Sequence, residues 1–452
     1  MARAKLQLIA ALSGGQVRPS GRLAHLLSRC LACGACETIC PADTPVTEAV
    51  LRARGELVAA LKLDQPGGRL PHAGPADVAA AGGERGPGRS SGGQSYTDRS
   101  DDPPAEIVLS CWSRYLQVLR SRPERPLAAV LGLLSGRPAG DLAGEVDQAG
   151  EAASTAVANA MAGTTTATRS GTGHGFGDAG SADTSRDAET TGLPRMVGPA
   201  DARRKVAYFP GCADLLWPRL WESTFLLFQR AGIRVVVPPG SYCCGFPFLE
   251  AGDLGMARQL VNENIKAFEK LDVEAIVTGC SAGARMLGRY AGEILGLTGF
   301  PVPVLELGEF LVHLVREDGF PQPDRAVPAR IAYLTPRGLG RSAEGAVELL
   351  NRVDQLEPVL LEEDQGCGGS LFLAALHPEQ HHQIIQRTVE AASARECRAV
   401  VAHNPLTMYL LDAYLESHGI DLRVVHLAEI LAMACFDGEV GTGNTFRPAE
   451  DV

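Results

Sequence analysis

Four cysteines near the N-terminus have a spacing that suits iron chemistry. They are Cys30, Cys33, Cys36 and Cys40, and Pro41 follows the last of them. Thiolates are soft anionic ligands, and such short intervals let one loop reach three iron corners of a cluster. The run therefore predicts a [4Fe-4S] cluster bound by these four residues.

Two alternatives stay open for this run. In proteins with two such clusters the fourth cysteine binds the other cluster, but this chain has only one run, so Cys40 either completes its own cluster or reaches elsewhere. A zinc site is the other alternative. It fits less well, because zinc sites usually pair two C-x-x-C elements at a longer separation.

Four more cysteines follow apolar runs of β type further along the chain. Cys212 follows "KVAYFPG", Cys243 and Cys244 follow "IRVVVPPGSY", and Cys280 follows "EAIVTG". The carboxyl ends of parallel strands meet at one edge of a sheet, where ligands bind. We therefore expect the four sulfurs to converge as a second candidate metal site. The alternative is that they are ordinary buried cysteines, which are common in protein cores.

The elements that must position these cysteines form two similar α/β modules. After Lys205, short apolar runs alternate with amphipathic helical patterns, and a second series starts at "RIAYLTPR". This alternation predicts parallel sheets covered by helices. Alignment of the two series places Arg337 at Cys212, Gly366 and Cys367 at Cys243 and Cys244, and Asn404 or His403 near Cys280. The second module is thus degenerate, and we expect His403 to be an unligated polar residue.

The fold class expected is α/β: a helical ferredoxin-type [4Fe-4S] N-terminal domain, followed by two tandem Rossmann-like cysteine-rich modules, the second degenerate. Segments rich in Gly, Ala, Ser and Pro cannot bury enough surface to offset chain entropy, so two insertions are expected to be disordered. The expected segments are a helical ferredoxin-like domain (1–64), a disordered insertion (65–105), a helical connector (106–137), a disordered low-complexity insertion (138–200), the first cysteine-rich module (201–325), the degenerate module (326–440) and a tail (441–452).

The composition indicates which kinds of partner the protein binds and where in the cell it is located. Lys and Arg total 42 against 53 Asp and Glu, the net charge is −11, and no basic run stands out, so nucleic acid is not expected as a partner. No apolar run approaches the ~20 residues that cross a bilayer, and no cleavage site follows the short apolar start. We expect a cytoplasmic protein, with peripheral contact at the inner face of the cell membrane as an alternative.

One further motif lies in the second module. "GLGRSA" (338–343) matches a dinucleotide-binding turn only weakly, because no acidic residue follows at the expected strand end.

The chain resembles the iron-sulfur subunit of glycolate oxidase and, more broadly, the cysteine-rich (CCG) domain family. That family includes subunits of heterodisulfide reductase and of anaerobic glycerol-3-phosphate dehydrogenase, and lactate-utilisation proteins. The motifs that carry the resemblance are "LSRCLACGACETICP", "YFPGC", "CCGFPFLEAGDLGMARQLVNENIKAF", "VTGC" and "GCGGSLFLAALHPE". The resemblance implies a cubane cluster at Cys30, Cys33, Cys36 and Cys40, and it assigns Cys212, Cys243, Cys244 and Cys280 to the first cysteine-rich module.

Three features depart from the family pattern. The family has two ferredoxin runs where this chain has one, and the second module has lost nearly all its thiols. The C-x-x-C that closes a module reads "CSAG" here, so Gly283 stands where a second cysteine is usual. One [4Fe-4S] cluster is therefore expected at the first run, and a second is a candidate in the first module.

The resemblance implies an iron-sulfur electron-transfer subunit of a flavin-dependent 2-hydroxyacid oxidase or dehydrogenase of the glycolate type. Electrons would pass from a flavin-containing partner subunit to an acceptor such as a quinone. FAD is expected on the partner only, because this chain has no phosphate-cradling loop and no acid/base constellation. No catalytic residue is assigned. The alternatives are a thiol/disulfide catalytic subunit of the heterodisulfide reductase type and a non-catalytic docking scaffold.

Overall fold

The computed structural model describes most of both expected modules and the N-terminal helices. The described residues are 2–32, 35–38, 44–64, 105–121, 195–199, 201–211, 217–238, 243–317, 319–320, 322–335, 342–361 and 370–436. Three of the expected ligands, Cys33, Cys40 and Cys212, lie outside these residues. So do Arg337, Gly366 and Cys367, the tail, the first insertion up to residue 104, and residues 122–194.

The N-terminal region is helical on both sides of the first cysteine run, as its pattern predicts. The helices are α1 (Ala2–Ser13), α2 (Gly21–Ser28), the short α3 (Ala35–Thr38), α4 (Val46–Leu61) and α6 (Ala105–Ser121). Ser20 ends the loop before α2 by accepting the N–H of Leu23, so α2 starts at a fixed residue and ends shortly before Cys30. Helix α6 forms the first part of the expected connector.

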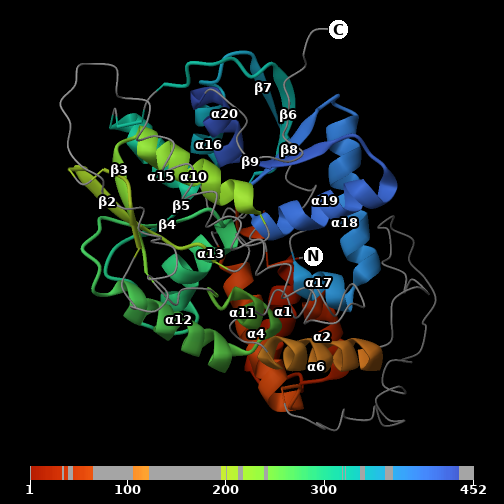
Figure 1. The fold of residues 1–452 in the computed structure, drawn as a ribbon. Helices are drawn as coiled ribbons and strands as arrows, with labels where there is room; N and C mark the ends of the chain where they lie inside the picture. The colour runs from red at the N-terminus through yellow and green to blue at the C-terminus, as the bar shows by residue number, and fades with distance from the viewer. Residues whose placement is uncertain are drawn as a thin grey trace, which may run out of the picture.

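Two sheets follow, and their parallel pairing confirms the predicted α/β architecture (Figure 1). In the first sheet the order is β1-β3-β2-β4-β5, and in the second it is β7-β6-β8-β9. The strands are β1 (Arg195–Val197), β2 (Arg204–Tyr208), β3 (Ile233–Val237), β4 (Ile276–Thr278), β5 (Val304–Glu306), β6 (Ala329–Tyr333), β7 (Leu356–Leu360), β8 (Ala399–Ala402) and β9 (Arg423–His426).

Helices connect the strands in both modules. They are α10 (Pro218–Arg230), α11 (Phe246–Ala251), α12 (Leu254–Phe268), α13 (Ser281–Arg285), a π-helical turn (Met286–Tyr290), α14 (Ala291–Glu293), α15 (Leu307–Arg316), α16 (Ser342–Leu350), α17 (Leu371–Leu376), α18 (Pro378–Ser393), α19 (Pro405–His418) and α20 (Leu427–Cys435). Among the described helices, none combines the length and the apolar character needed to cross a bilayer.

The expectation of disorder up to residue 200 is wrong at its end. Residues 195–197 form β1, which pairs antiparallel with β3 and places Val197 opposite Val235. The physical reason is that this short apolar stretch completes the edge of an existing sheet, a contact that composition averaged over 138–200 does not reveal. Strands β5 and β9 were not predicted either. They extend each sheet by one parallel strand.

The two modules share one apolar core. Helix α10 of the first packs against α20 of the second, and α15 of the first packs against α16 of the second. The first helix of each module thus packs on the last helix of the other. In Figure 1, α10, α15, α16 and α20 lie together between the two sheets. This arrangement brings the ends of β4 and β5 to the ends of β8 and β9.

A buried carboxyl in this interface makes stability depend on pH. Glu429 of α20 accepts from Trp217 Nε1 at 2.7 Å and from the N–H of His426 at 2.8 Å, and burial raises its pKa from 4.5 to about 7. Because the folded state favours the proton, this contribution to stability is complete below pH 4.5 and is lost as the pH rises through 7. The loss at pH 8 is at most about 3 kcal/mol.

We expect Glu429→Gln, which keeps the accepting oxygen and removes the titration, to be more stable than the parent at pH 8 and to lose this advantage at pH 5. Urea unfolding at the two pH values measures the difference. Glu56→Gln, at an exposed position on α4, is the matched control and should change neither value. An equal effect of Glu429→Gln at both pH values would contradict the assignment.

Candidate functional site: the cysteine loops

Cys30 and Cys36 of the first run lie near one another. Cys30 follows α2, Cys36 lies on α3, and both thiols are half-buried. Burial raises the pKa of Cys36, and the nearby Cys30 and Glu37 raise it further. A bound metal cation would stabilise the thiolate form of Cys36, which burial and the neighbouring Cys30 oppose.

Arg54 of α4 holds this loop from inside the protein. Its side chain is fully buried, and its guanidinium donates to the backbone carbonyls of Leu27, Ser28 and Cys30. It also donates to the carbonyl of Glu250 on α11, at 2.7 Å from Nη1. One side chain therefore joins the loop of Cys30 to the helix that follows Cys243 and Cys244.

The charge of Arg54 fits an anionic group at Cys30. Among the described residues it forms no ion pair, because all its hydrogen bonds go to carbonyl oxygens. Burial lowers the pKa of Arg54, and nearby Cys30 and Glu250 oppose that shift. A buried cation without a partner is costly, whereas a [4Fe-4S] cluster with four thiolates is anionic. The donor set of the first run thus fits such a cluster.

The paired cysteines of the first module lie in a tight buried turn. Cys243 and Cys244 are both buried, and Asn264 of α12 holds the turn by donating to the carbonyl of Cys243 at 2.7 Å. Gly245 has φ +85°, and a side chain there would lie 3.1 Å from the carbonyl oxygen of Ala257. The glycine after the two cysteines is therefore required. Its N–H donates to the sulfur of Cys243 at 3.4 Å.

Cys280 lies in the same kind of environment at the end of β4. Its sulfur accepts the N–H of Gly283 at 3.4 Å, and so it caps the start of α13. Hydrogen bonds from backbone N–H groups to sulfur stabilise the thiolate form and tune bound clusters. Gly283 leaves room beside it, because an added Cβ would lie 3.5 to 3.8 Å from its neighbours, which include the sulfur of Cys280.

The three cysteine loops follow neighbouring strands. Strand β2 lies between β3 and β4 in the sheet, all three are parallel, and the loops of Cys212, Cys243 and Cys280 leave their carboxyl ends. This order is the one on which the predicted second site depends. The convergence of all four sulfurs stays a prediction, because Cys212 lies outside the described residues.

Two histidines of the second module hold the backbone on both sides of Cys280, His426 through its side chain and His403 through its backbone carbonyl. His426 Nε2 donates to the carbonyl of Gly279 at 3.1 Å, and the carbonyl of His403 accepts the N–H of Ser281 at 2.8 Å. His403 follows β8, and His426 ends β9. The thiol-poor module therefore positions a cysteine of the other module.

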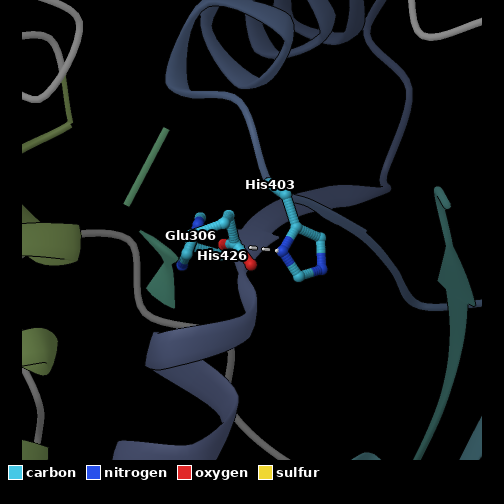
Figure 2. Close-up of side chains that lie close together, drawn as sticks. All are labelled: Glu306, His403 and His426. Carbon is cyan, nitrogen blue, oxygen red and sulfur yellow. Dashed lines mark hydrogen bonds and ion pairs between the residues drawn. The ribbon is translucent and has the colours of Figure 1, made fainter. Parts of the chain in front are cut away.

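Glu306, His403 and His426 lie together as a buried cluster between the modules, in which His403 and Glu306 form a hydrogen bond (Figure 2). His403 Nδ1 lies 3.1 Å from Glu306 Oε1, while Glu306 Oε2 accepts from Gly308 and Glu309 and caps α15. These donors to the second carboxylate oxygen are backbone N–H groups, so the carboxylate joins the start of α15 to the end of β8.

The hydrogen bonds of this cluster indicate that it supports the surrounding backbone, and they fit a metal site less well. One ligand atom from each residue lies within 4.8 Å of the others. However, His426 Nδ1 accepts the N–H of Ala428 at 3.1 Å and Nε2 donates to Gly279, so both nitrogens are used. Burial and the nearby His403 lower the pKa of His426 well below its ordinary value, which keeps the ring neutral. A metal would have to displace one of these bonds.

The structure also decides between the two residues aligned with Cys280. Asn404 caps α19 as Cys280 caps α13, so Asn404 occupies the equivalent position and His403 that of Gly279. His403 Nδ1 makes a hydrogen bond with Glu306, and the expectation that His403 is unligated stays a prediction. Sequence reasoning missed Glu306 and His426, whose signal was the matching pair "LELGEFL" and "VHLAEIL" at the ends of the two modules.

Parts of this chain are similar in sequence to known proteins. Residues 206–288 match the family described as CCG, Cysteine-rich domain. The chain is 28% identical over 260 residues to "Probable glycolate oxidase iron-sulfur subunit" of Bacillus subtilis, covering 53% of this chain and 56% of the relative. It is 29% identical over 242 residues to a subunit of the fumarate reductase (CoM/CoB) of Methanothermobacter marburgensis, covering 52% and 47%. The chain thus spans about half the length of these two relatives.

Two further matches differ in coverage. "Lactate utilization protein A" of Geobacillus thermodenitrificans is 28% identical over 239 residues, which cover 50% of this chain and 98% of that protein. A solved structure of a hypothetical protein from Helicobacter pylori gives a TM-score of 0.41 at 12% identity, over 55% of this chain and 52% of its own, too low to support an argument. The match to the cysteine-rich domain over residues 206–288 and the similarity to these named relatives agree with the motifs, so this chain contains a segment similar to the CCG domain and resembles iron-sulfur proteins over about half its length.

Proposed function

We propose that this chain is the electron-transfer subunit of a flavin-dependent 2-hydroxyacid oxidase or dehydrogenase. One [4Fe-4S] cluster would be held by Cys30, Cys33, Cys36 and Cys40. A second iron-sulfur cluster would be held in the first module by Cys212, Cys243, Cys244 and Cys280. A partner subunit would carry the flavin and oxidise a substrate of the glycolate class, and a quinone or similar acceptor would receive the electrons.

The observation that carries this proposal is the direct link between the two cysteine loops. Arg54 donates both to the carbonyl of Cys30 and to that of Glu250, which lies on the helix after Cys243 and Cys244. Arg285 of α13, five residues after Cys280, makes a second link through the carbonyl of Ala32 at 3.5 Å. These contacts hold the loop of the first run against the first module, an arrangement that an electron relay needs and that neither a scaffold nor an isolated thiol site requires.

Iron and acid-labile sulfide content of the anaerobically purified full chain tests the proposal. When bound, the clusters would accept and donate single electrons. We expect about eight irons per chain and about four after Cys243→Ser with Cys244→Ser, with the cluster at Cys30 still visible by electron paramagnetic resonance after reduction. Gly283→Cys, which has room for its side chain, should increase iron retention in the first module.

Three results would count against the proposal in different ways. Stoichiometric zinc without iron would exclude both clusters. About four irons in the parent chain, unchanged by the double replacement, would limit the relay to the first run. Disulfide reduction that depends on Cys243 and Cys244 while the cluster at Cys30 is unaffected would favour a thiol/disulfide catalyst.

A further inference from the structure

The guanidinium of Arg54 lies directly against the loop of Cys30, to which it donates hydrogen bonds. The guanidinium is fully buried, and its central carbon lies 4.5 Å from the ring centroid of Phe372 on α17. The nearby carboxyl of Glu250 accepts from Ser370 at 2.6 Å and forms no hydrogen bond with Arg54. An apolar ring and carbonyl oxygens therefore surround the guanidinium, and burial raises the pKa of the nearby Glu250 to about 7, so this carboxyl offsets the positive charge only in part.

Such a charge favours whichever state of its neighbour is more negative. Reduction adds one electron to an iron-sulfur cluster without making or breaking a bond, so the reduced cluster is the more negative state. In a buried site a nearby positive charge acts with little screening by solvent. The reduced form is then stabilised relative to the oxidised form, and the reduction potential rises.

We propose that Arg54 is a positioning residue that raises the reduction potential of the cluster at Cys30 and fixes that loop against the first cysteine-rich module. The inference rests on the proposed function, because it concerns the cluster assigned there. The higher potential makes this cluster a better acceptor for an electron from a reduced flavin. The same side chain sets the separation between this cluster and the second site through its two carbonyl contacts.

Two replacements separate the charge from the contacts. Arg54→Gln keeps an N–H donor for a carbonyl and removes the charge, whereas Arg54→Lys keeps the charge and loses the forked geometry. Arg230→Gln is the matched control, since Arg230 of α10 also donates to a cysteine carbonyl, that of Cys435, in the other core. The full chain is loaded anaerobically, and the cluster signal is followed by electron paramagnetic resonance during a redox titration.

We expect Arg54→Gln to lower the potential so that the ratio of reduced to oxidised cluster falls at least tenfold at a fixed potential, which is about 59 mV for one electron. Arg54→Lys and Arg230→Gln should stay close to the parent. Equal potentials for Arg54→Gln and the parent would overturn the inference, and so would loss of iron from both Arg54 variants, which would make the residue purely structural. Absence of iron from the parent chain would instead refute the proposed function.

Discussion

Phe372→Ala is expected to destabilise the protein by about 3–5 kcal/mol, the cost of removing a fully buried aromatic ring. Phe372 has no exposed surface, and its ring centroid lies 5.0 Å from that of Trp112 and 5.6 Å from that of Tyr115, both on α6. Arg54 of α4 covers its face. Helices α4, α6 and α17, from three distant parts of the sequence, therefore depend on this single ring.

Denaturant unfolding measures the loss, and iron content measures its consequence for the cluster loop. Leu360→Ala is the matched control in the same module, because Leu360 is 53% exposed and its truncation should change stability by less than about 0.5 kcal/mol. Trp112 would also lose a neighbour, although its Nε1 still donates to the carbonyl of Ala251. A loss below about 1 kcal/mol would mean that the three helices close around the cavity.

The alternation of strands and helices was predictable because each run carries its own periodic signal. The run "KVAYF" became β2 and "RIAYL" became β6, each followed by an amphipathic helix, α10 or α16. Parallel pairing then follows from the crossover connections. The first cysteine run was equally visible in the sequence, since its four cysteines stand within eleven residues and their spacing alone predicts a cluster, which stays a proposal.

The strands that the sequence did not reveal are short and depend on their neighbours. Strand β1 has three residues and pairs only with β3, and β5 has three residues after the Pro-rich stretch "GFPVP". Nothing in such a segment distinguishes a strand from a loop until a sheet edge is present. Arg54 was missed for a related reason. Its partners lie 24 to 27 residues away on the loop of Cys30 and 196 residues away at Glu250.

The cluster of Glu306, His403 and His426 was missed because its residues come from both modules. Glu306 ends β5, His403 follows β8 and His426 ends β9, so their meeting depends on how the two sheets face each other. Alignment of the modules was informative about thiols that had been lost. It gave no reason to look at residues outside the cysteine positions.

Glu306→Ala is expected to cost about 3 kcal/mol and to loosen Cys280. The replacement removes the cap of α15 and leaves His403 buried without its partner, two losses of about 1–2 kcal/mol each. Glu306→Gln keeps an accepting oxygen and should cost less. Glu348→Ala, which removes a surface ion pair with Arg316, is the control and should cost less than about 1 kcal/mol.

Two measurements distinguish support of the Cys280 loop by this cluster from a general loss of protein stability. A double-mutant cycle of Glu306→Ala with His403→Ala should give a coupling energy of about 0.5–3 kcal/mol, whereas independent residues would give additive losses. Iron retention in the first module should fall in Glu306→Ala, because His403 and His426 hold the backbone on both sides of Cys280. If stability falls while iron in the first module stays at the parent level, then the second module only supports the fold. If both fall, the second module, which keeps only part of the cysteine pattern, supports the site of the first module.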